Sequence, residues 1–406
     1  MDKAEFWREA RRDLAGPLAG VRVLEATTSW AGPMCACLLA DLGADVIKVE
    51  EPKGEVTRRL PPFVTGRISY LHATVNRNKR SLTLDLRRPE GREIFLKLAA
   101  RADAVVENFR PGTLARWGVG YADVRRVKPD IVYVSISGFG QWGPGHDRPG
   151  YDPIVEAESG FMARNGEPDG EPMRCATYIG DDVAGLHGAL AALAALRHRD
   201  ATGEGQHVDI ALMDTLLFQS NGMLTLGAMG LEPPRMGNES HYAAPVGVYR
   251  CRDGAVFFAV LLDAHWRKLA RVMGRGDAAA DPDYATQADR VRHRGRVNAM
   301  VSEWMAGRTV AEAVGICARE GIPAGPVRTY GEAARDSHVI AREMLRPVAQ
   351  ENGRPVPLTA PPAKFSRTPL AIRAAAPALG AHTDEVLAEL GIDEAERRRL
   401  RESKII

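Results

Sequence analysis

The sequence has no apolar run long enough to cross a membrane, few cysteines and almost no net charge. Its longest apolar run, residues 189–196, is far shorter than the roughly 20 residues of a membrane span, and residues 1–14 are charged, without the apolar core of a signal peptide. The 54 Lys and Arg residues nearly balance the 52 Asp and Glu residues, which gives a formal charge of +2. A balanced charge creates no long-range field for nucleic acid or anionic lipid. We therefore expect a cytoplasmic protein that binds neither nucleic acid nor membrane.

Metal and nucleotide motifs are also missing. Of the five cysteines, Cys35 and Cys37 lie two residues apart in a predicted helix and so point to different sides, which is poor geometry for a shared metal. We expect reduced thiols and no bound metal. There is no Walker loop and no G-x-S-x-G motif. Residues 138–143, GFGQWG, have the spacing of a dinucleotide motif, but the three prolines that follow prevent the required helix, so we expect no nicotinamide cofactor.

The segments that are present alternate between strand and helix. Apolar or alternating segments, several of them followed by amphipathic ones, recur through the first 140 residues. This order predicts a parallel, Rossmann-like α/β sheet. The predicted strands cover residues 21–27, 45–52, 81–87, 103–109 and 130–140, and the predicted helices cover residues 29–44 and 90–102.

The character of the chain changes near residue 225. Residues 247–262 are typical of an antiparallel hairpin around an Asp-Gly turn, whereas the preceding part continues the strand and helix order. A chain of 406 residues is expected to form two domains. We predict a large domain from residues 1–224, a smaller α+β domain from 225–330, and a C-terminal segment, 331–406, that returns to the large domain.

Two adjacent acids, Asp181 and Asp182, stand where a helix over residues 182–198 is predicted to begin. Acidic residues are common at helix N-termini, where they accept hydrogen bonds from free N–H groups, so capping is one interpretation. The alternative is a nucleophile, because small residues surround the pair and let a ligand or another backbone come close. The small residues are Gly180, Ala184, Gly185, Gly188 and Ala189.

Ordered motifs extend along nearly the whole chain. They begin with PLAGVRVLEATTSWAGPMCACLLADLGADVIKVEEPKGE (17–55) and end with LGAHTDEVLAELG (379–391). Between them lie NRNKRSLTLDLRRPEG (76–91), DAVVENFRPGTLARWG (103–118), VSISGFGQWGP (134–144), PGYDPIVEAESGFM (149–162), GDDVAGLHGALAALAALRHRDATGEGQHVDIALMD (180–214) and GIPAGPV (321–327). In this order they resemble the class III CoA-transferases, which include formyl-CoA transferase, carnitine CoA-transferase and α-methylacyl-CoA racemase.

The resemblance implies a large Rossmann-like domain, a small domain and a homodimer of two interlocked ring-like chains. It also implies an activity, in which CoA moves from an acyl-CoA donor such as succinyl-CoA to a small organic acid. The transfer passes through an aspartyl anhydride and an aspartyl-CoA thioester, so it needs a carboxylate nucleophile. No permanently bound cofactor is implied, because coenzyme A enters as part of the substrate.

The family motif around Gly185 also implies the site residues. Its register makes Asp181 the nucleophile, with Asp182 as the reserve candidate and as a support for the helix start. The basic stretch at residues 76–81 would by itself indicate a solvated turn, but the resemblance places it near the nucleotide, where cations suit phosphates. The CoA contacts implied in this way are Trp30, Ala31, Lys79, Arg80, Asn108, Phe109, Arg116 and Tyr151.

Several positions depart from the better-known branches. Trp30 stands where formyl-CoA transferase has glutamine, Glu51 where it has arginine and Ser137 where it has lysine, which disfavours formyl-CoA and oxalate as substrates. The racemase branch pairs the aspartate with a histidine in G-H-D, whereas residues 150–152 read G-Y-D, so transferase is favoured over racemase. A racemase-type acid/base enzyme and a non-catalytic acyl-CoA-binding protein remain the alternatives.

Overall fold

The computed structural model describes residues 2–66 and 68–406, which divide into two units. The larger unit runs to Ser159 and also contains Cys175–Asn221 and Ser337–Ile406, and the smaller unit contains Gly160–Arg174 and Gly222–Asp336. The segment 160–174, which we expected in the large domain, thus groups with the smaller unit. The reason is local hydrogen bonding, since Arg164 donates to the carbonyl of Pro233 and Arg235 to that of Gly170.

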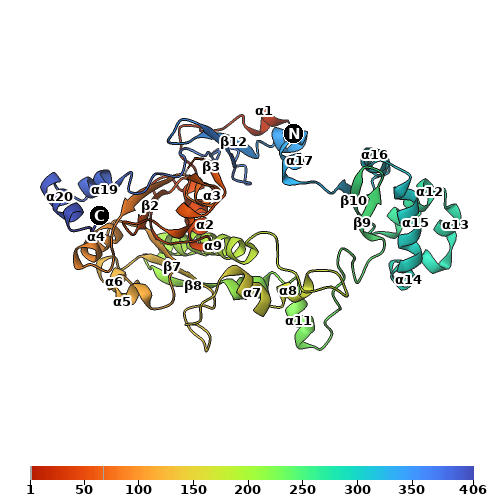
Figure 1. Ribbon diagram of the computed structural model, residues 1–406, viewed down its shortest axis with the longest axis horizontal. Helices are drawn as coiled ribbons and strands as arrows, with labels where there is room; N and C mark the ends of the chain where they lie inside the picture. Colours follow the sequence, from red (N-terminus) through yellow and green to blue (C-terminus); the bar gives the residue numbers. More distant parts are fainter. Residues whose placement is uncertain (1, 67) are drawn as a thin grey trace. The chain divides into compact units, whose positions relative to one another are not determined.

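The core of the larger unit is a six-stranded parallel sheet in the order β5-β2-β1-β6-β7-β8 (Figure 1). The parallel α/β sheet predicted from the sequence is confirmed. The first strand lies inside the sheet; β2 and β5 extend it on one side and β6, β7 and β8 on the other. Open parallel sheets bind ligands beyond their carboxyl edge, where the winding reverses in this way. The strands are β1 Arg22–Ala26, β2 Asp45–Glu50, β5 Lys79–Thr83, β6 Ala104–Glu107, β7 Val132–Ser137 and β8 Gln206–Ala211.

Helices and two small hairpins complete this unit. No helix forms between β7 and Asp152, which confirms that GFGQWG does not start a dinucleotide-binding helix. The helices are α1 Lys3–Phe6, α2 Ala31–Asp41, η1 Val56–Arg59, α3 Tyr70–Val75, α4 Pro89–Ala99, α5 Thr113–Arg116, α6 Tyr121–Val127, α7 Asp152–Glu158, α9 Ile179–Thr202, α10 Leu212–Phe218, α18 Ser337–Ala341, α19 Thr383–Glu389 and α20 Glu394–Glu402. The hairpins are β3 Phe63–Thr65 with β4 Ile68–Ser69, and β12 Leu345–Ala349 with β13 Pro355–Thr359.

The smaller unit contains the predicted hairpin, in which β9 and β10 pair antiparallel and β11 adds a third strand. Its core gathers around the buried Trp266, Phe258 and Met305. The elements are α8 Phe161–Arg164, α11 Met223–Ala228, β9 Val246–Cys251, β10 Gly254–Ala259, α12 Asp263–Val272, α13 Gly276–Ala280, η2 Pro282–Tyr284, α14 Gln287–Arg292, α15 Arg294–Ala306, α16 Val310–Glu320, β11 Ala324–Pro326 and α17 Tyr330–Ala334.

The small residues near the start of α9 serve close packing inside the protein. A Cβ on Gly185 would lie 2.9 Å from the carbonyl oxygen of Ala31, and one on Gly188 would lie 2.9 Å from Ile136 of β7. These glycines therefore accommodate α2 and the sheet. By length and composition α9 could span a membrane, but such a helix is also common in protein cores, and here it packs on α2 and β7.

The C-terminal segment Ser337–Ile406 belongs to the larger unit. Helices α19 and α20 lie beside the sheet edge and α4 in Figure 1, and the hydroxyl of Thr383 accepts the N–H of Thr83 at 3.1 Å. Val386, Leu387 and Leu400 join the same hydrophobic core as β1, β2 and β5.

Three fully buried charges join the strands β1, β2 and β5. The carboxylate of Glu25 accepts Lys48 Nζ at 2.9 Å on one oxygen and lies 2.8 Å from Lys79 Nζ on the other. Lys79 also donates to the carbonyl of Pro33. Buried charges are tolerated only when paired in this way, so each lysine depends on the glutamate between them.

We predict that Glu25→Gln destabilises the larger unit by about 3–5 kcal/mol, because it leaves two buried ammonium groups without their counter-charge. Urea unfolding followed by circular dichroism measures the loss. The exposed Glu394, which pairs with Arg398 at 3.2 Å, is the control, and Glu394→Gln should leave the midpoint nearly unchanged. Equal midpoints for both variants would contradict this role of Glu25.

Candidate active site

Two loops meet at the carboxyl edge of the sheet, where the winding reverses between β1 and β6. Asn108, which follows β6, accepts the N–H of Thr28 and donates to its carbonyl, both at 2.8 Å. A Cβ on Gly32 would lie 2.8 Å from the amide carbon of Asn108, so only glycine fits there. Asn108 therefore fixes the loop after β1 through two hydrogen bonds to the backbone of Thr28.

Trp30 joins this loop to the start of α9. It is the N-cap residue of α2, and its indole N–H donates to Asp182 Oδ1 at 2.6 Å. Its ring also contacts Tyr178, with centroids 5.7 Å apart. The β1 loop and the Asp181–Asp182 pair are thus one connected site.

The start of α9 is capped from outside the helix. Its N-cap residue, Tyr178, makes no side-chain cap, and the N–H of Gly180 donates instead to Asp152 Oδ1 at 2.7 Å. Asp152 is a buried residue of α7. Asp182 lies in the first turn of α9, but its carboxylate accepts the indole of Trp30, and Asp152 supplies the cap.

Four carboxyl groups gather at this point. Burial, and then a hydrogen bond between the Asp152 and Glu156 carboxyls, raise the pKa of Asp152 to about 6. Burial, followed by the charges of Asp152 and Asp182, raises the pKa of Asp181 to about 7. Burial also raises the pKa of Asp182, against the hydrogen bond from Trp30. A carboxylate that is ionised near neutrality but poorly solvated is a reactive one.

Asp181 and Asp182 differ in the hydrogen bonds that their carboxylates accept. Asp182 accepts the indole of Trp30, whereas no hydrogen bond from residues 2–66 or 68–406 engages the carboxylate of Asp181. Of the two acids, Asp181 therefore has the carboxylate that these hydrogen bonds leave unoccupied, and Asp182 has the one that Trp30 orients.

A cavity of 570 Å³ opens beyond the carboxyl ends of β1, β2 and β5, and Thr28 lies in its wall. Phe109 and Trp117 form an apolar side, with ring centroids 5.3 Å apart. Arg59 and Arg87 also line the cavity, together with the acids Glu50, Glu51, Glu55 and Asp85, of which Asp85 pairs with Arg87 at 2.7 Å. Its size and mixed lining are typical of a site for a nucleotide-sized ligand.

Comparisons with known proteins identify the family. The description of the matching family is CoA-transferase family III, and the match covers residues 18–383. The chain belongs to CoA-transferase family III. It is 39% identical to the succinate–glutarate CoA-transferase of Agrobacterium fabrum, over 92% of this chain and 96% of that protein. It is 37% identical to the succinyl-CoA–L-malate CoA-transferase beta subunit of Chloroflexus aurantiacus, over 96% of this chain and 98% of that one.

Solved structures agree with this family. A crystal structure of a CAIB/BAIF family protein from Brucella suis superposes with a TM-score of 0.83 and 36% identity, covering 93% of this chain and 100% of that chain. The orthorhombic form of Rv3272 from M. tuberculosis has a TM-score of 0.83 and 29% identity, covering 91% and 99%. The protein is therefore a family III CoA-transferase with a mixed α/β fold.

The structure brings some of the predicted CoA contacts of this CoA-transferase together. Trp30 and Asn108 shape the β1 loop, and Ala31, which is buried, begins α2 beside Gly185. Phe109 lines the cavity.

Four other predicted contacts lie elsewhere. The ammonium of Lys79 is fully buried against Glu25 and does not line the cavity. Arg80 is occupied by Asp45, Glu385 and Glu389. Arg116 is exposed and bonds Thr113, and Tyr151 is 69% exposed; neither lines the cavity.

The cavity cations Arg59 and Arg87 were missed by sequence reasoning. Lys79 and Arg80 begin strand β5, whereas Arg87 follows its end, and the carboxyl ends of parallel strands face the ligand site. That rule could have selected Arg87 from the sequence. Among the described residues, no group of three or more His, Cys, Asp or Glu side chains is arranged to hold a metal.

The raised pKa of Asp181 predicts a pH-dependent effect on stability. Between pH 4 and pH 7 the unfolded chain ionises Asp181 but the folded chain does not, so rising pH destabilises the wild type. We predict that Asp181→Asn is increasingly more stable than wild type over this range, by on the order of 2–4 kcal/mol above pH 7. Chemical unfolding at pH 5 and pH 8 measures the gain. Asp147→Asn, at an exposed carboxylate, is the control, and a pH-independent gain for Asp181→Asn would refute the prediction.

Proposed function

We propose that this CoA-transferase uses Asp181 as a covalent nucleophile that carries CoA between two carboxylic acids. The observation that supports it most is the position of Asp181, which has a free, poorly solvated carboxylate beside an oriented Asp182. The rings of Trp30 and Tyr178 contact each other beside the acidic pair, and an anhydride formed there would need protection from water.

The proposed reaction has four covalent steps. An oxygen of Asp181 attacks the thioester carbon, the C–S bond breaks, and a mixed aspartyl anhydride and CoA thiolate form. The thiolate attacks the aspartyl carbonyl, which releases the first acid and leaves an aspartyl-CoA thioester. The acceptor acid attacks that thioester to form a new anhydride and thiolate, and the thiolate then attacks the acceptor carbonyl, giving the new acyl-CoA and free Asp181.

The thiolate must remain bound throughout, so the enzyme has to hold the rest of CoA. We propose that the 570 Å³ cavity holds its nucleotide, with Phe109 and Trp117 against the base and Arg59 and Arg87 near phosphates. Binding energy from this remote part of the substrate can then be used at the reacting carbon.

The names of the relatives suggest the acids. Those of Agrobacterium fabrum, Chloroflexus aurantiacus and Haloarcula hispanica, the last a succinyl-CoA:mesaconate CoA-transferase at 37% identity, all contain succinate or succinyl-CoA. We propose succinyl-CoA as donor and a small dicarboxylic acid as acceptor. The free thiols of all five cysteines support a reducing, cytoplasmic location.

Covalent trapping tests the proposal. We expect the protein mixed with succinyl-CoA and then hydroxylamine to gain a hydroxamate on the peptide that contains Asp181, because hydroxylamine captures activated aspartyl groups. Intact-mass and peptide analysis locate the tag. Asp181→Asn should abolish it, while the matched neighbour variant Asp182→Asn should keep it at a reduced rate.

Other outcomes select the alternatives. A tag on Asp182 would move the nucleophile by one residue. Exchange of the α-proton of a 2-methylacyl-CoA without any tag would support a racemase. Binding of acyl-CoA with neither tag nor exchange would support a non-catalytic binding protein.

We also propose that the chain is a homodimer. Helix α9 exposes Leu186 and Leu190, one turn apart, at 56% and 61%, and Phe218 beside them is 76% exposed. A contiguous patch of large apolar side chains is costly in water, and a second copy of the chain is the occupant that the family resemblance implies.

Light scattering on the eluting protein measures the mass. We predict a mass about twice the 44.1 kDa of the chain. The double variant Leu186→Arg, Leu190→Arg should lose this mass or the ability to assemble, and Val127→Arg, an exposed apolar residue on α6, should retain it. A wild-type monomer would contradict the proposal.

A further inference from the structure

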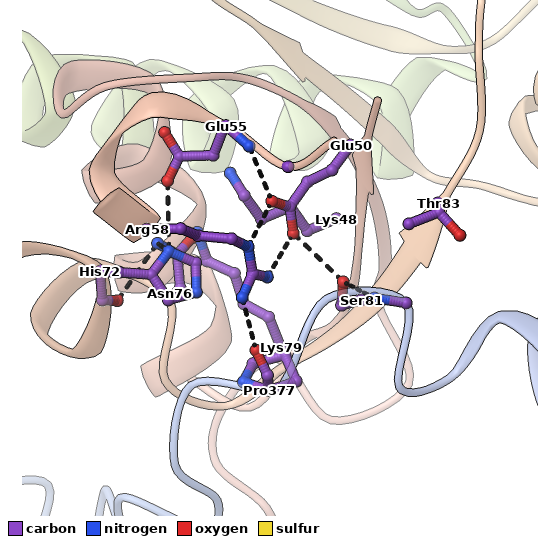
Figure 2. Close-up of polar contacts among 12 residues, drawn as sticks. Lys48, Glu50, Glu55, Arg58, His72, Asn76, Lys79, Ser81, Thr83 and Pro377 are labelled. Carbon is purple, nitrogen blue, oxygen red and sulfur yellow. Dashed lines mark hydrogen bonds and ion pairs between the residues drawn. The ribbon is translucent and has the colours of Figure 1, made fainter. Parts of the chain in front are cut away.

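Glu55 is a buried carboxylate in the wall of the cavity, between β2 and η1. The residue is 7% exposed. The N–H of Thr57 donates to Oε2 at 3.0 Å and its hydroxyl donates to Oε1, while His72 Nδ1 lies 3.2 Å from Oε1. Figure 2 shows the Glu55 carboxylate facing His72, while its backbone N–H donates to Glu50, which pairs with Arg58.

The same carboxylate reaches the loop after β1. Oε2 accepts the N–H of Ser29 at 3.2 Å and lies 3.4 Å from the hydroxyl of Thr28. Ser29 has φ of +63°, a left-handed conformation that residues with a side chain rarely adopt. The next residue, Trp30, donates its indole N–H to Asp182. Glu55 is therefore connected to the nucleophile region through one strained residue.

The charge of Glu55 is fixed. Burial alone would raise its pKa, but the hydrogen bond from His72, the charge of Lys48 and the two bonds from Thr57 hold the pKa well below its usual range. Burial lowers the pKa of His72, so this partner is neutral. Glu55 thus takes no part in proton transfer at neutral pH.

The negative charge of Glu55 does not suit a residue that binds the phosphates of CoA. The cavity is proposed to hold the phosphates of CoA, and a buried negative charge in its wall repels them. The surrounding network is balanced without the ligand, since the carboxylates of Glu25, Glu50 and Glu55 face the cations Lys48, Lys79 and Arg58. Through its bonds to Thr28 and Ser29, Glu55 contacts the β1 loop, whose next residue, Trp30, bonds Asp182.

We propose that Glu55 is a positioning residue for the nucleophile. It holds Ser29 in the left-handed conformation, which places the Trp30 indole on Asp182 and so orients the acidic pair beside the thioester. Asn108 fixes Thr28 from the other side. The kinetic consequence rests on the proposed attack by Asp181, whereas the structural consequence does not.

The test is Glu55→Gln, which keeps the size of the side chain and removes its charge. We expect kcat to fall about 10- to 100-fold, because displacement of catalytic groups by about 1 Å has costs of this order. The KM for acyl-CoA should stay the same or fall, since a repelling charge leaves the cavity. In the Trp30→Phe background, which already lacks the indole N–H, Glu55→Gln should cause little further loss.

The control is Asp41→Asn. Asp41 is equally buried and pairs with Arg77 at 2.6 Å, but it lies at the opposite end of α2 from Trp30. This variant should lower the melting temperature while leaving kcat unchanged, which separates a loss of stability from a loss of positioning.

Amide hydrogen exchange of residues 27–34 without substrate separates this inference from the proposed function. We expect faster exchange in Glu55→Gln than in wild type or Asp41→Asn. Faster exchange in a protein whose wild type transfers no CoA would support the positioning role and overturn the proposed function. The positioning role would be overturned if Glu55→Gln showed the amide exchange or the kcat of the wild type. It would also be overturned if the variant changed only KM, or if its effect added fully to that of Trp30→Phe.

Discussion

The close approach of α9 to α2 is the constraint on which the site depends. Gly185 brings the backbone of α9 so near to Ala31 that a single Cβ would overlap its carbonyl oxygen. Trp30 immediately precedes Ala31, and Asp182 lies about one helical turn before Gly185, so this contact puts the indole of Trp30 within bonding reach of the Asp182 carboxylate. Without it, the β1 loop and the start of α9 would belong to separate parts of the molecule.

Charge is handled differently on the two sides of this contact. Beneath the β1 loop, buried carboxylates and cations neutralise one another, which makes that region rigid and costly to alter. At the start of α9 the carboxyl groups face one another without cations among their hydrogen-bond partners in residues 2–66 and 68–406, and burial raises the pKa of Asp152, Asp181 and Asp182. The paired charges beneath the β1 loop thus contrast with the carboxyl groups at the start of α9, which lack counter-charges.

Sequence reasoning predicted the parallel sheet and the hairpin because both follow from local periodicity and turn chemistry. It also selected Asp181, through a motif in which the register is fixed by Gly185. It misplaced Lys79, because a lysine in a basic stretch reads as exposed, and only the three-dimensional pairing with Glu25 shows that it is buried. The cap from Asp152 and the bond from Glu55 to Ser29 join residues 28 and 26 positions apart, so no local pattern could indicate them.

The acidic cluster bears on the order of the proposed steps. An acyl-CoA presents a neutral carbonyl to Asp181, but an acceptor acid is an anion and must approach Asp152, Glu156 and Asp182 as well. In the proposed mechanism the charge of Asp181 is gone once it has become a thioester, and Asp182 is bonded to Trp30. In the proposed mechanism, the first half of the reaction therefore removes one of the negative charges that repel the acceptor, and we expect the free enzyme to disfavour acids that arrive before the acyl-CoA. The covalent intermediate of that mechanism would thus set the order of the exchange.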